Sequence, residues 1–174
     1  MKNLNIEIKA RCSKKTEIRE ILLQNGARFL GTDKQTDTYF NCRNGRLKFR
    51  EGNIEYSLVS YQRENKTTPK KSDVIYYHPR KNTPLKEILN TALGKLIIVK
   101  KTREIYFIDN IKFHLDRVEN LGDFVEIEAI DHDGKIDETT LLEQCNKYLT
   151  LLGISSKDLI ECSYSDLLLA QSEK

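Results

Sequence analysis

The sequence Asn5-Ile6-Glu7-Ile8-Lys9-Ala10-Arg11 alternates strictly between polar and apolar side chains. Alternation with a period of two predicts a β-strand with one apolar and one polar face. The polar face carries a carboxylate, an ammonium and a guanidinium group in a row. Such a face is typical of the solvated side of an antiparallel sheet. It becomes informative because charged faces of the same kind recur in later segments.

Further segments predict that this strand belongs to a larger sheet. Strands are also expected at residues 35–40, 46–50, 54–63, 72–78, 96–108, 111–118 and 124–130. Helices are expected between residues 13 and 26, from 83 to 93 and from 136 to 152, while residues 160–170 fit a short strand or a helix. No domain boundary interrupts the pattern, so residues 1–174 are expected to form a single domain. Consecutive strands joined by hairpins favour a mostly antiparallel sheet that is closed or strongly curved.

Length, charge and cysteine content narrow the possible functions. The 174 residues include 29 basic and 26 acidic side chains, and the net charge of +3 does not by itself indicate a nucleic-acid partner. The four cysteines form no C-x-x-C pair that would suggest a zinc or redox site. The first residues lack the apolar stretch of a signal peptide, and no segment suits a membrane helix. We therefore expect a soluble cytoplasmic protein with free thiols, and neither nucleic acid nor membrane as a partner.

The charged residues fall on one face of each predicted strand. The basic ones are Lys9, Arg11, Arg46, Lys48, Arg50, Lys101 and Arg103, and the acidic ones are Glu7, Asp116, Glu126 and Glu128. In an ordinary sheet these would be solvated outer faces. In an inverted arrangement they would line the lumen of a barrel whose apolar exterior is covered by the predicted helices. The alternation is compatible with both arrangements, although the scarcity of Thr, Ser and Gln among the charges favours the second.

A lumen of this kind would hold many like charges in a confined space. Such charges repel one another unless a ligand compensates them. A polyanion suits Lys and Arg, which bind phosphate oxygens by charge-assisted hydrogen bonds, and Mg²⁺ or Mn²⁺ suits the carboxylates. Together these are the components that phosphoryl or nucleotidyl transfer requires.

Six segments, in order along the chain, resemble motifs of one protein family. Residues 115–128, Leu-Asp-Arg-Val-Glu-Asn-Leu-Gly-Asp-Phe-Val-Glu-Ile-Glu, are close to the pattern L-D-x-V-x-x-L-G-x-F-x-E-I-E. The others are Asn-Ile-Glu-Ile-Lys at 5–9 (E-x-E-x-K), Asp-Thr-Tyr-Phe at 37–40, Arg-Leu-Lys-Phe-Arg at 46–50, Lys-Thr-Arg at 101–103 (K-x-R) and Ser-Tyr-Ser-Asp-Leu-Leu at 163–168. The chain thus resembles, over nearly its whole length, the CYTH superfamily of triphosphate tunnel metalloenzymes. This superfamily includes class IV adenylate cyclases, thiamine triphosphatases and inorganic triphosphatases.

The resemblance implies an α+β fold in which eight antiparallel strands form a closed barrel, or tunnel, with a charged lumen and with helices packed on the outside. It implies a triphosphate-containing small molecule as substrate and one or two Mg²⁺ or Mn²⁺ ions as cofactor. The implied metal ligands are Glu7, Glu126 and Glu128, with Asp116 nearby. The implied phosphate-binding residues are Lys9, Lys48, Arg50, Lys101 and Arg103, with Arg11, Arg46, Arg63 and His114 as further candidates. Among all of these, Glu7, Lys9, Lys101 and Arg103 are expected to be catalytic.

One position departs from the family pattern. Asn5 replaces the first glutamate of the E-x-E-x-K motif. An amide oxygen can coordinate Mg²⁺ but carries no charge, so the number of bound metal ions stays open.

Three functions follow as alternatives. The first is a metal-dependent triphosphatase, in which water attacks the terminal phosphorus. The second is an adenylate cyclase, in which the ribose 3′-hydroxyl of ATP attacks the α-phosphorus and pyrophosphate leaves. The third, favoured by Asn5, is a module that binds polyphosphate or a nucleotide without turnover. A monomer and a homodimer are both compatible with the sequence.

Overall fold

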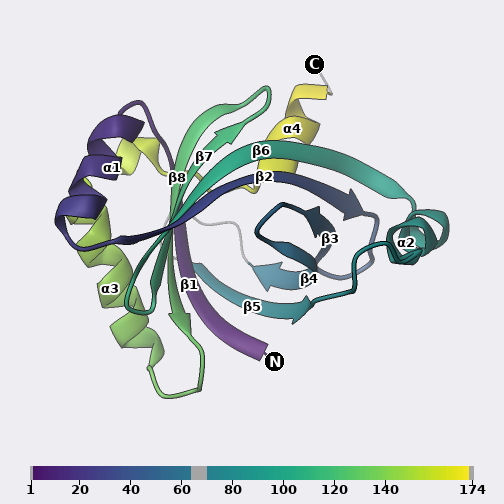
Figure 1. Ribbon diagram of the computed structural model, residues 1–174, viewed down its shortest axis with the longest axis horizontal. Coiled ribbons are helices and arrows are strands. Elements are labelled where there is room, and N and C mark those ends of the chain that lie inside the picture. The colour runs from purple at the N-terminus through teal and green to yellow at the C-terminus, as the bar shows by residue number, and fades with distance from the viewer. Residues whose placement is uncertain (1, 64–69, 173–174) are drawn as a thin grey trace.

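The computed structural model describes residues 2–63 and 70–172. Its eight strands form one antiparallel sheet, and four α-helices lie around it (Figure 1). The strands are β1 (Lys2–Arg11), β2 (Arg28–Phe40), β3 (Arg46–Glu51), β4 (Tyr56–Arg63), β5 (Lys70–Tyr77), β6 (Lys95–Ile108), β7 (Ile111–Val118) and β8 (Gly122–Asp131). The helices are α1 (Lys15–Gln24), α2 (Leu85–Leu93), α3 (Glu138–Leu151) and α4 (Tyr164–Ser172), with a short 3₁₀ helix at Ser156–Asp158.

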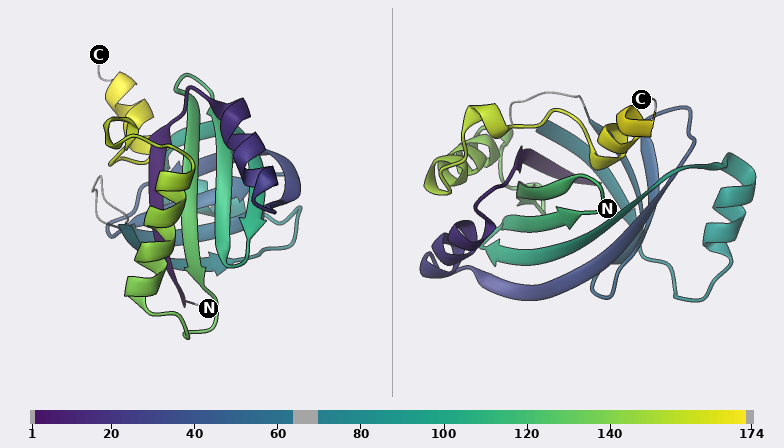
Figure 2. Two further views of the ribbon diagram at one scale, coloured as in Figure 1. Left: turned by 90° about the vertical axis from the view of Figure 1, so that its left-hand side faces the viewer. Right: turned by 90° about the horizontal axis from the view of Figure 1, so that it is seen from above.

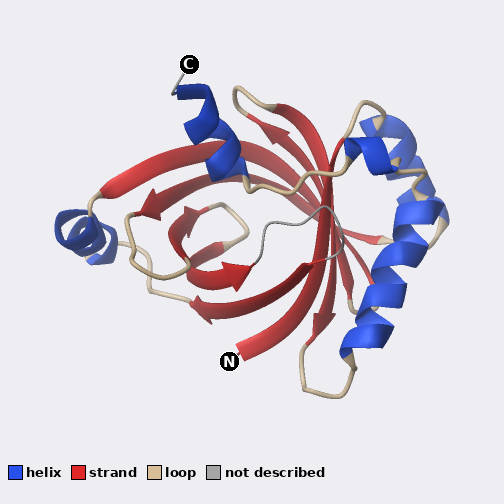
Figure 3. Ribbon diagram, turned by 180° about the vertical axis from the view of Figure 1, so that it is seen from behind, coloured by secondary structure: helices blue, strands red, loops and turns tan. Residues whose placement is uncertain are grey.

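The sheet curls around a central tunnel. Strand pairing follows the order β1-β5-β4-β3-β2-β6-β7-β8, and β8 pairs in turn with β1. The expectation of a closed barrel with helices packed on its outside nevertheless needs correction, because the shape of the sheet differs from that of a barrel. The strands are very unequal, with 13 and 14 residues in β2 and β6 but 6 in β3, so the result is a tunnel-like curled sheet rather than a regular barrel (Figure 3). The helices cover only part of its outer surface.

One sequence-based boundary also needs correction, and one open alternative is settled. Strand β2 begins at Arg28 rather than at residue 35, because its first half pairs with β6 up to Phe107. A register shift at Gly31, where φ is +148°, interrupts the alternation that would have revealed this first half. The segment 160–170, which suited either a strand or a helix, contains the start of α4.

The main apolar core lies outside the tunnel, between the sheet and the helices α1 and α3. The apolar face of β1, formed by Ile6, Ile8 and Ala10, is buried there with Leu22 of α1 and Leu141 of α3. Figure 2 shows both helices on the same side of the sheet. The apolar residues of β1 therefore face outward under the helices, and its charged residues face inward. This is the inverted arrangement that the strand faces allowed.

The other two helices contribute differently. Helix α4 packs through Leu167 and Leu168 beside a smaller apolar cluster that includes Val99 and Phe124. Helix α2 lies on the opposite side of the molecule from α1 and α3, and none of its residues is fully buried (Figure 1). Among the residues that the structure describes, no helix combines the length and apolar character needed to cross a membrane.

Candidate functional site

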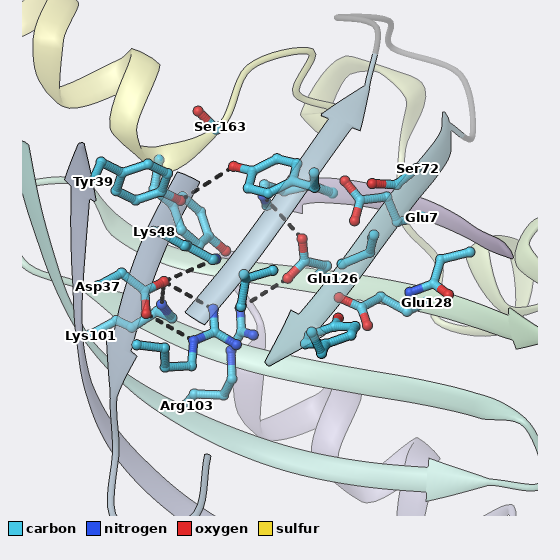
Figure 4. A pocket seen from close by; sticks show the side chains of 18 residues that line it. Glu7, Asp37, Tyr39, Lys48, Ser72, Lys101, Arg103, Glu126, Glu128 and Ser163 are labelled. Atoms are coloured by element: carbon cyan, nitrogen blue, oxygen red, sulfur yellow. Dashed lines mark hydrogen bonds and ion pairs between the residues drawn. The ribbon is translucent and has the colours of Figure 1, made fainter. Parts of the chain in front are cut away.

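Inward-facing side chains from seven strands and the start of α4 line one cavity in the tunnel (Figure 4). They include most of the charged residues that the sequence singles out. The lining consists of Asn5, Glu7, Lys9, Asp37, Tyr39, Lys48, Arg50, Val59, Tyr61, Ser72, Val74, Tyr76, Lys101, Arg103, Glu126, Glu128, Ser163 and Tyr164. Strands of alternating character place these groups in the lumen because their apolar neighbours are held outward by the core.

The basic part of the cavity is organised around Asp37. Arg50 donates two hydrogen bonds to its carboxylate at 2.8 and 2.9 Å, and the ammonium groups of Lys101 and Lys48 lie 2.7 and 3.1 Å from it. Burial disfavours the charged carboxylate, but the charges of Arg50, Lys101 and Lys48 outweigh burial and hold the pKa of Asp37 well below its usual value. One buried anion therefore holds three cations together.

Lys101 is the most desolvated of these cations. Its ammonium group is almost inaccessible. Burial is the largest influence on the pKa of Lys101. Together with the charges of Arg50 and Arg103, burial lowers this pKa to about 7, against the opposing influence of Asp37. A bound anion would restore the charged form, so Lys101 is suited to respond to a phosphate ligand.

A second ion-pair network occupies the middle of the tunnel. Arg103 donates to both oxygens of Asp116, at 2.7 and 2.6 Å, and to Glu126 at 2.9 Å. The Lys9 ammonium lies 3.1 Å from the other oxygen of Glu126 and 4.2 Å from the centre of the Tyr164 ring. The Tyr164 hydroxyl donates to Asp116 at 2.8 Å. These contacts fix the orientation of Arg103 and Lys9 toward the cavity.

The acidic part of the cavity lies along β8 and the strands beside it. Glu7 on β1 stands opposite Glu128 on β8. Nδ1 of His114 lies 3.0 Å from Oε2 of Glu126 and 3.7 Å from Oε1 of Glu128. One ligand atom from each of His114, Glu126 and Glu128 falls within 4.8 Å of the other two.

The protonation of these groups follows from their burial. Burial, followed by the neighbouring Glu126 and by Glu7, raises the pKa of Glu128 to about 7. Burial, followed by the charges of Arg103 and Lys112, lowers the pKa of His114 to about 3, so its imidazole is neutral at neutral pH. Neutral imidazole and carboxylate oxygen are both ligands for divalent cations, and Asn5 adds a buried amide oxygen with no hydrogen-bond partner among the described residues. The donor set therefore fits a divalent cation.

A second cavity adjoins the first toward the other end of the tunnel. The two cavities share Asn5, Arg50, Tyr76 and Glu128. The rest of the second cavity is more aromatic and apolar, and is lined by Ile54, Glu55, Tyr56, Ser57, His78, Phe107, Lys112, His114, Ile130 and His132. The tunnel thus offers a charged compartment next to one that suits an organic group.

The predicted site residues divide into four groups, one of which is His114 in the second cavity. The structure brings together in the charged cavity Glu7, Lys9, Lys48, Arg50, Lys101, Arg103, Glu126 and Glu128. Arg11, Arg46 and Asp116 do not line it: Arg11 donates to the carbonyl of Leu121 at 3.2 Å, Arg46 pairs with Asp166 at 2.8 Å, and Asp116 is held by Arg103 and Tyr164. The Arg63 side chain lies outside the described residues.

Sequence reasoning missed two contributors to the site. Asp37 was noted only as part of a motif, although it stands directly opposite Arg50 in the β2–β3 pairing. Asp37 and Tyr39 lie on one face of β2, and they pair with Arg50 and Lys48 on the basic face of β3. This alternation in the two strands could have indicated the contact. Tyr164 appears only within the motif at 163–168, and its link to Asp116 spans 48 residues of sequence, which no local pattern reveals.

Comparison with known proteins places this geometry in a family. The sequence model of the CYTH domain matches residues 3–164. A protein of Methanocaldococcus jannaschii named "putative adenylate cyclase" is 26% identical over 175 residues, which cover 94% of this chain and 98% of that protein. A Pyrococcus horikoshii protein of solved structure, PH1012, superimposes with a TM-score of 0.74 at 24% identity, covering 94% and 98% of the two chains. A "putative adenylate cyclase" of Vibrio parahaemolyticus shares the fold, with a TM-score of 0.74 at 16% identity over 95% and 98% of the chains. Since the domain model spans most of the sequence, this chain belongs to the CYTH domain family.

Proposed function

We propose that this protein is an enzyme that binds a triphosphate group in the tunnel, together with a divalent cation, and catalyses hydrolysis at the terminal phosphorus. The observation that carries the proposal is the convergence of five basic side chains beside an acidic cluster in one cavity. The five are Lys9, Lys48, Arg50, Lys101 and Arg103. A triphosphate carries enough negative charge to compensate these groups, and a cation compensates the carboxylates.

The basic residues would share the work of holding the phosphate chain. Arg103 is already fixed by two hydrogen bonds to Asp116, so its remaining donor capacity is aimed without further loss of side-chain entropy. Lys48, Arg50 and Lys101 all contact Asp37, so three more donors lie together in one part of the cavity. Positioning and charge neutralisation are the main contributions that phosphoryl transfer requires of a protein.

The acidic residues would hold the cation. Glu7, Glu126 and Glu128 line the cavity and supply the carboxylate oxygens that Mg²⁺ and Mn²⁺ prefer. When bound, the cation would neutralise phosphate charge and favour the hydroxide form of a nearby water. A carboxylate of this cluster would take the proton of the attacking water, and the water oxygen would bond to the terminal phosphorus. The bond from that phosphorus to the bridging oxygen would break, which releases orthophosphate and leaves a diphosphate.

An adenylate cyclase reaction is the second candidate. Two relatives that align over nearly their full length are named "putative adenylate cyclase". The second cavity, which adjoins the charged one and contains Tyr76, His78 and Phe107, suits the organic part of a nucleotide. In this reaction the same basic residues would hold the phosphates while the ribose 3′-hydroxyl gives its proton to a carboxylate of the acidic cluster and its oxygen attacks the α-phosphorus. The bond from the α-phosphorus to the bridging oxygen would break, and pyrophosphate would leave.

One experiment separates these reactions from binding without turnover. The protein is incubated with ATP, inorganic triphosphate and thiamine triphosphate, each with Mg²⁺ or Mn²⁺. Orthophosphate release supports the hydrolase, cyclic AMP with pyrophosphate supports the cyclase, and tight binding without products rejects both enzymes.

Two double variants test the site assignment. If the variant with both Glu126→Gln and Glu128→Gln keeps its metal-dependent turnover, the assignment of these residues as metal ligands is wrong. If the variant with both Lys101→Ala and Arg103→Ala binds triphosphate unchanged, the tunnel is not the triphosphate-binding site. The matched control is Arg117→Ala, because Arg117 is an exposed residue of β7 that pairs with Asp123 outside the cavity.

A further inference from the structure

We infer that His114 supplies a nitrogen ligand to the cation held by Glu126 and Glu128, so that the site binds Mn²⁺ and other first-row transition ions in preference to Mg²⁺. The inference rests on the proposed function, because it concerns the cation of the same site. It goes beyond that function by making the ligand set mixed rather than built from oxygen alone.

The spacing of the three side chains carries the first step. Nδ1 of His114 is 3.0 Å from Oε2 of Glu126 and 3.7 Å from Oε1 of Glu128. Neighbouring ligands of an octahedral ion, each about 2.1 Å from it, lie about 3 Å from one another. The three atoms therefore need only small movements to surround one ion.

An unpartnered polar atom in the cavity carries the second step. Asn5 is only 3% exposed and lines the charged cavity beside Glu128, yet its Oδ1 has no hydrogen-bond partner among the described residues. Buried polar atoms are seldom left unsatisfied unless a ligand or ion completes them.

The existing ion pairs leave room for the cation. Oε2 of Glu126 accepts from both Arg103 and His114, while Oε1 contacts Lys9. An ion bound by Nδ1 and Oε2 would replace the hydrogen bond between these two atoms, and Arg103 would keep its two hydrogen bonds to Asp116. Nδ1 would bind the ion through its lone pair and the imidazole proton would reside on Nε2, so the ring would stay neutral.

The nitrogen ligand decides which ions are preferred. Mg²⁺ binds oxygen ligands almost exclusively and keeps much of its water, whereas imidazole suits first-row transition ions. Mn²⁺ accepts carboxylate and imidazole ligands together, which makes it the appropriate probe for a site of two carboxylates and one histidine.

The test is direct spectroscopy of Mn²⁺ bound to the purified protein. Pulsed electron paramagnetic resonance of the wild-type protein with Mn²⁺ is expected to show coupling to a ¹⁴N nucleus. The coupling should vanish in His114→Gln and persist in His132→Gln, a matched control in an exposed histidine of the second cavity. Titration should show Mn²⁺ affinity falling about tenfold or more in His114→Gln, while Mg²⁺ affinity changes much less.

The outcomes separate this inference from the proposed function. Mn²⁺ bound to the wild-type protein without nitrogen coupling would overturn the inference, even if triphosphate turnover is found. Nitrogen coupling without turnover would support the inference and reject the enzyme. Because the wild-type spectrum needs no substitution, poor folding of His114→Gln would not weaken the test.

Discussion

Glu7 and Glu128 stand directly opposite each other on the antiparallel strands β1 and β8, with both side chains lining the same cavity. Opposed like charges destabilise a sheet. Burial, followed by Glu126 and Glu7, raises the pKa of Glu128 to about 7. Without a cation, and at a pH between about 4.5 and 7, the carboxyl group of Glu128 therefore holds a proton in the folded protein that it releases in the unfolded chain.

The first prediction concerns the pH dependence of stability without divalent ions. The folded pKa of Glu128 lies above the ordinary value of 4.5, so the folded state binds more protons between these two values. The free energy of unfolding should fall as pH rises from about 4.5 to about 7, by up to 2–3 kcal/mol. Urea unfolding in EDTA should show this fall in the wild-type protein but a smaller one in Glu128→Gln. An identical slope in both proteins would contradict the raised pKa.

The second prediction concerns Asp37 as a counter-anion. In Asp37→Asn the cations Lys48, Arg50 and Lys101 lose their shared partner, and the unfolding free energy should fall by about 3–5 kcal/mol. Affinity for inorganic triphosphate should rise, because a competing carboxylate is gone. Calorimetric titration and thermal unfolding with and without triphosphate measure both effects.

Asp33 provides the matched control on the same strand. It is as buried as Asp37, but its oxygens accept from the backbone N–H groups of Ile54 and Glu55 at 2.9 Å. Asp33→Asn should lower stability without changing triphosphate affinity. Weaker triphosphate binding in Asp37→Asn would instead make Asp37 a residue that positions the cations for the ligand.

The third prediction uses the lowered pKa of Lys101, which is about 7. A triphosphate binds the protonated amine better, so raising the pH from 7 to 9 should weaken binding by up to about 50-fold through this residue. Lys101→Arg removes this titration, since arginine stays charged. The affinity of both proteins for inorganic triphosphate should be compared across this range. Parallel pH profiles would show that Lys101 does not titrate there.

The fourth prediction separates the two contacts of Tyr164. Tyr164→Phe removes the hydrogen bond to Asp116 but keeps the ring beside Lys9, and should cost about 1.5–3 kcal/mol of stability because the acceptor is charged. Tyr164→Leu also removes the ring, and should cost more and weaken triphosphate binding through Lys9. Denaturant unfolding and triphosphate titration of the two variants measure the difference. Equal triphosphate affinities would show that the ring does not orient Lys9.

Much of the site could be predicted from strand parity. Lys9 lies in the lumen because it alternates with Ile8 and Ala10, which are buried in the core with residues of α1 and α3. Lys48 also alternates with apolar residues, whereas Lys101 lies between Lys100 and Thr102 and is placed by the parity it shares with Arg103. Arg11 and Arg46 share this parity but are the last residue of β1 and the first of β3. Strand ends lie at the rim of the tunnel, where other partners are in reach. Alternation fixes the face of a residue but not its depth.

The remaining contacts depend on relationships that a single sequence does not contain. The form of the sheet follows from the unequal lengths of β2, β3 and β6, and β2 is longer than its alternation indicates. His114 was a weak phosphate-binding candidate, and its proximity to Glu126 depends on the register between β7 and β8. Registers of this kind are set by packing across the whole domain.

The pairing of β1 with β8 has a consequence for the synthesis of the protein. Ala10 lies opposite Val125 in the pairing of β1 with β8. The backbone groups on this edge of β1 therefore stay unpaired until β8 has been synthesised. On the ribosome, the wall that carries Glu7 and Lys9 stays incomplete until β8 has emerged, and its apolar partners Ile6 and Ile8 stay uncovered until α3 follows. Late closure of distant contacts slows folding and exposes strand edges to aggregation. The nascent chain therefore gains its charged cavity only after β8 has emerged, and until then the edge of β1 that pairs with β8 stays unpaired.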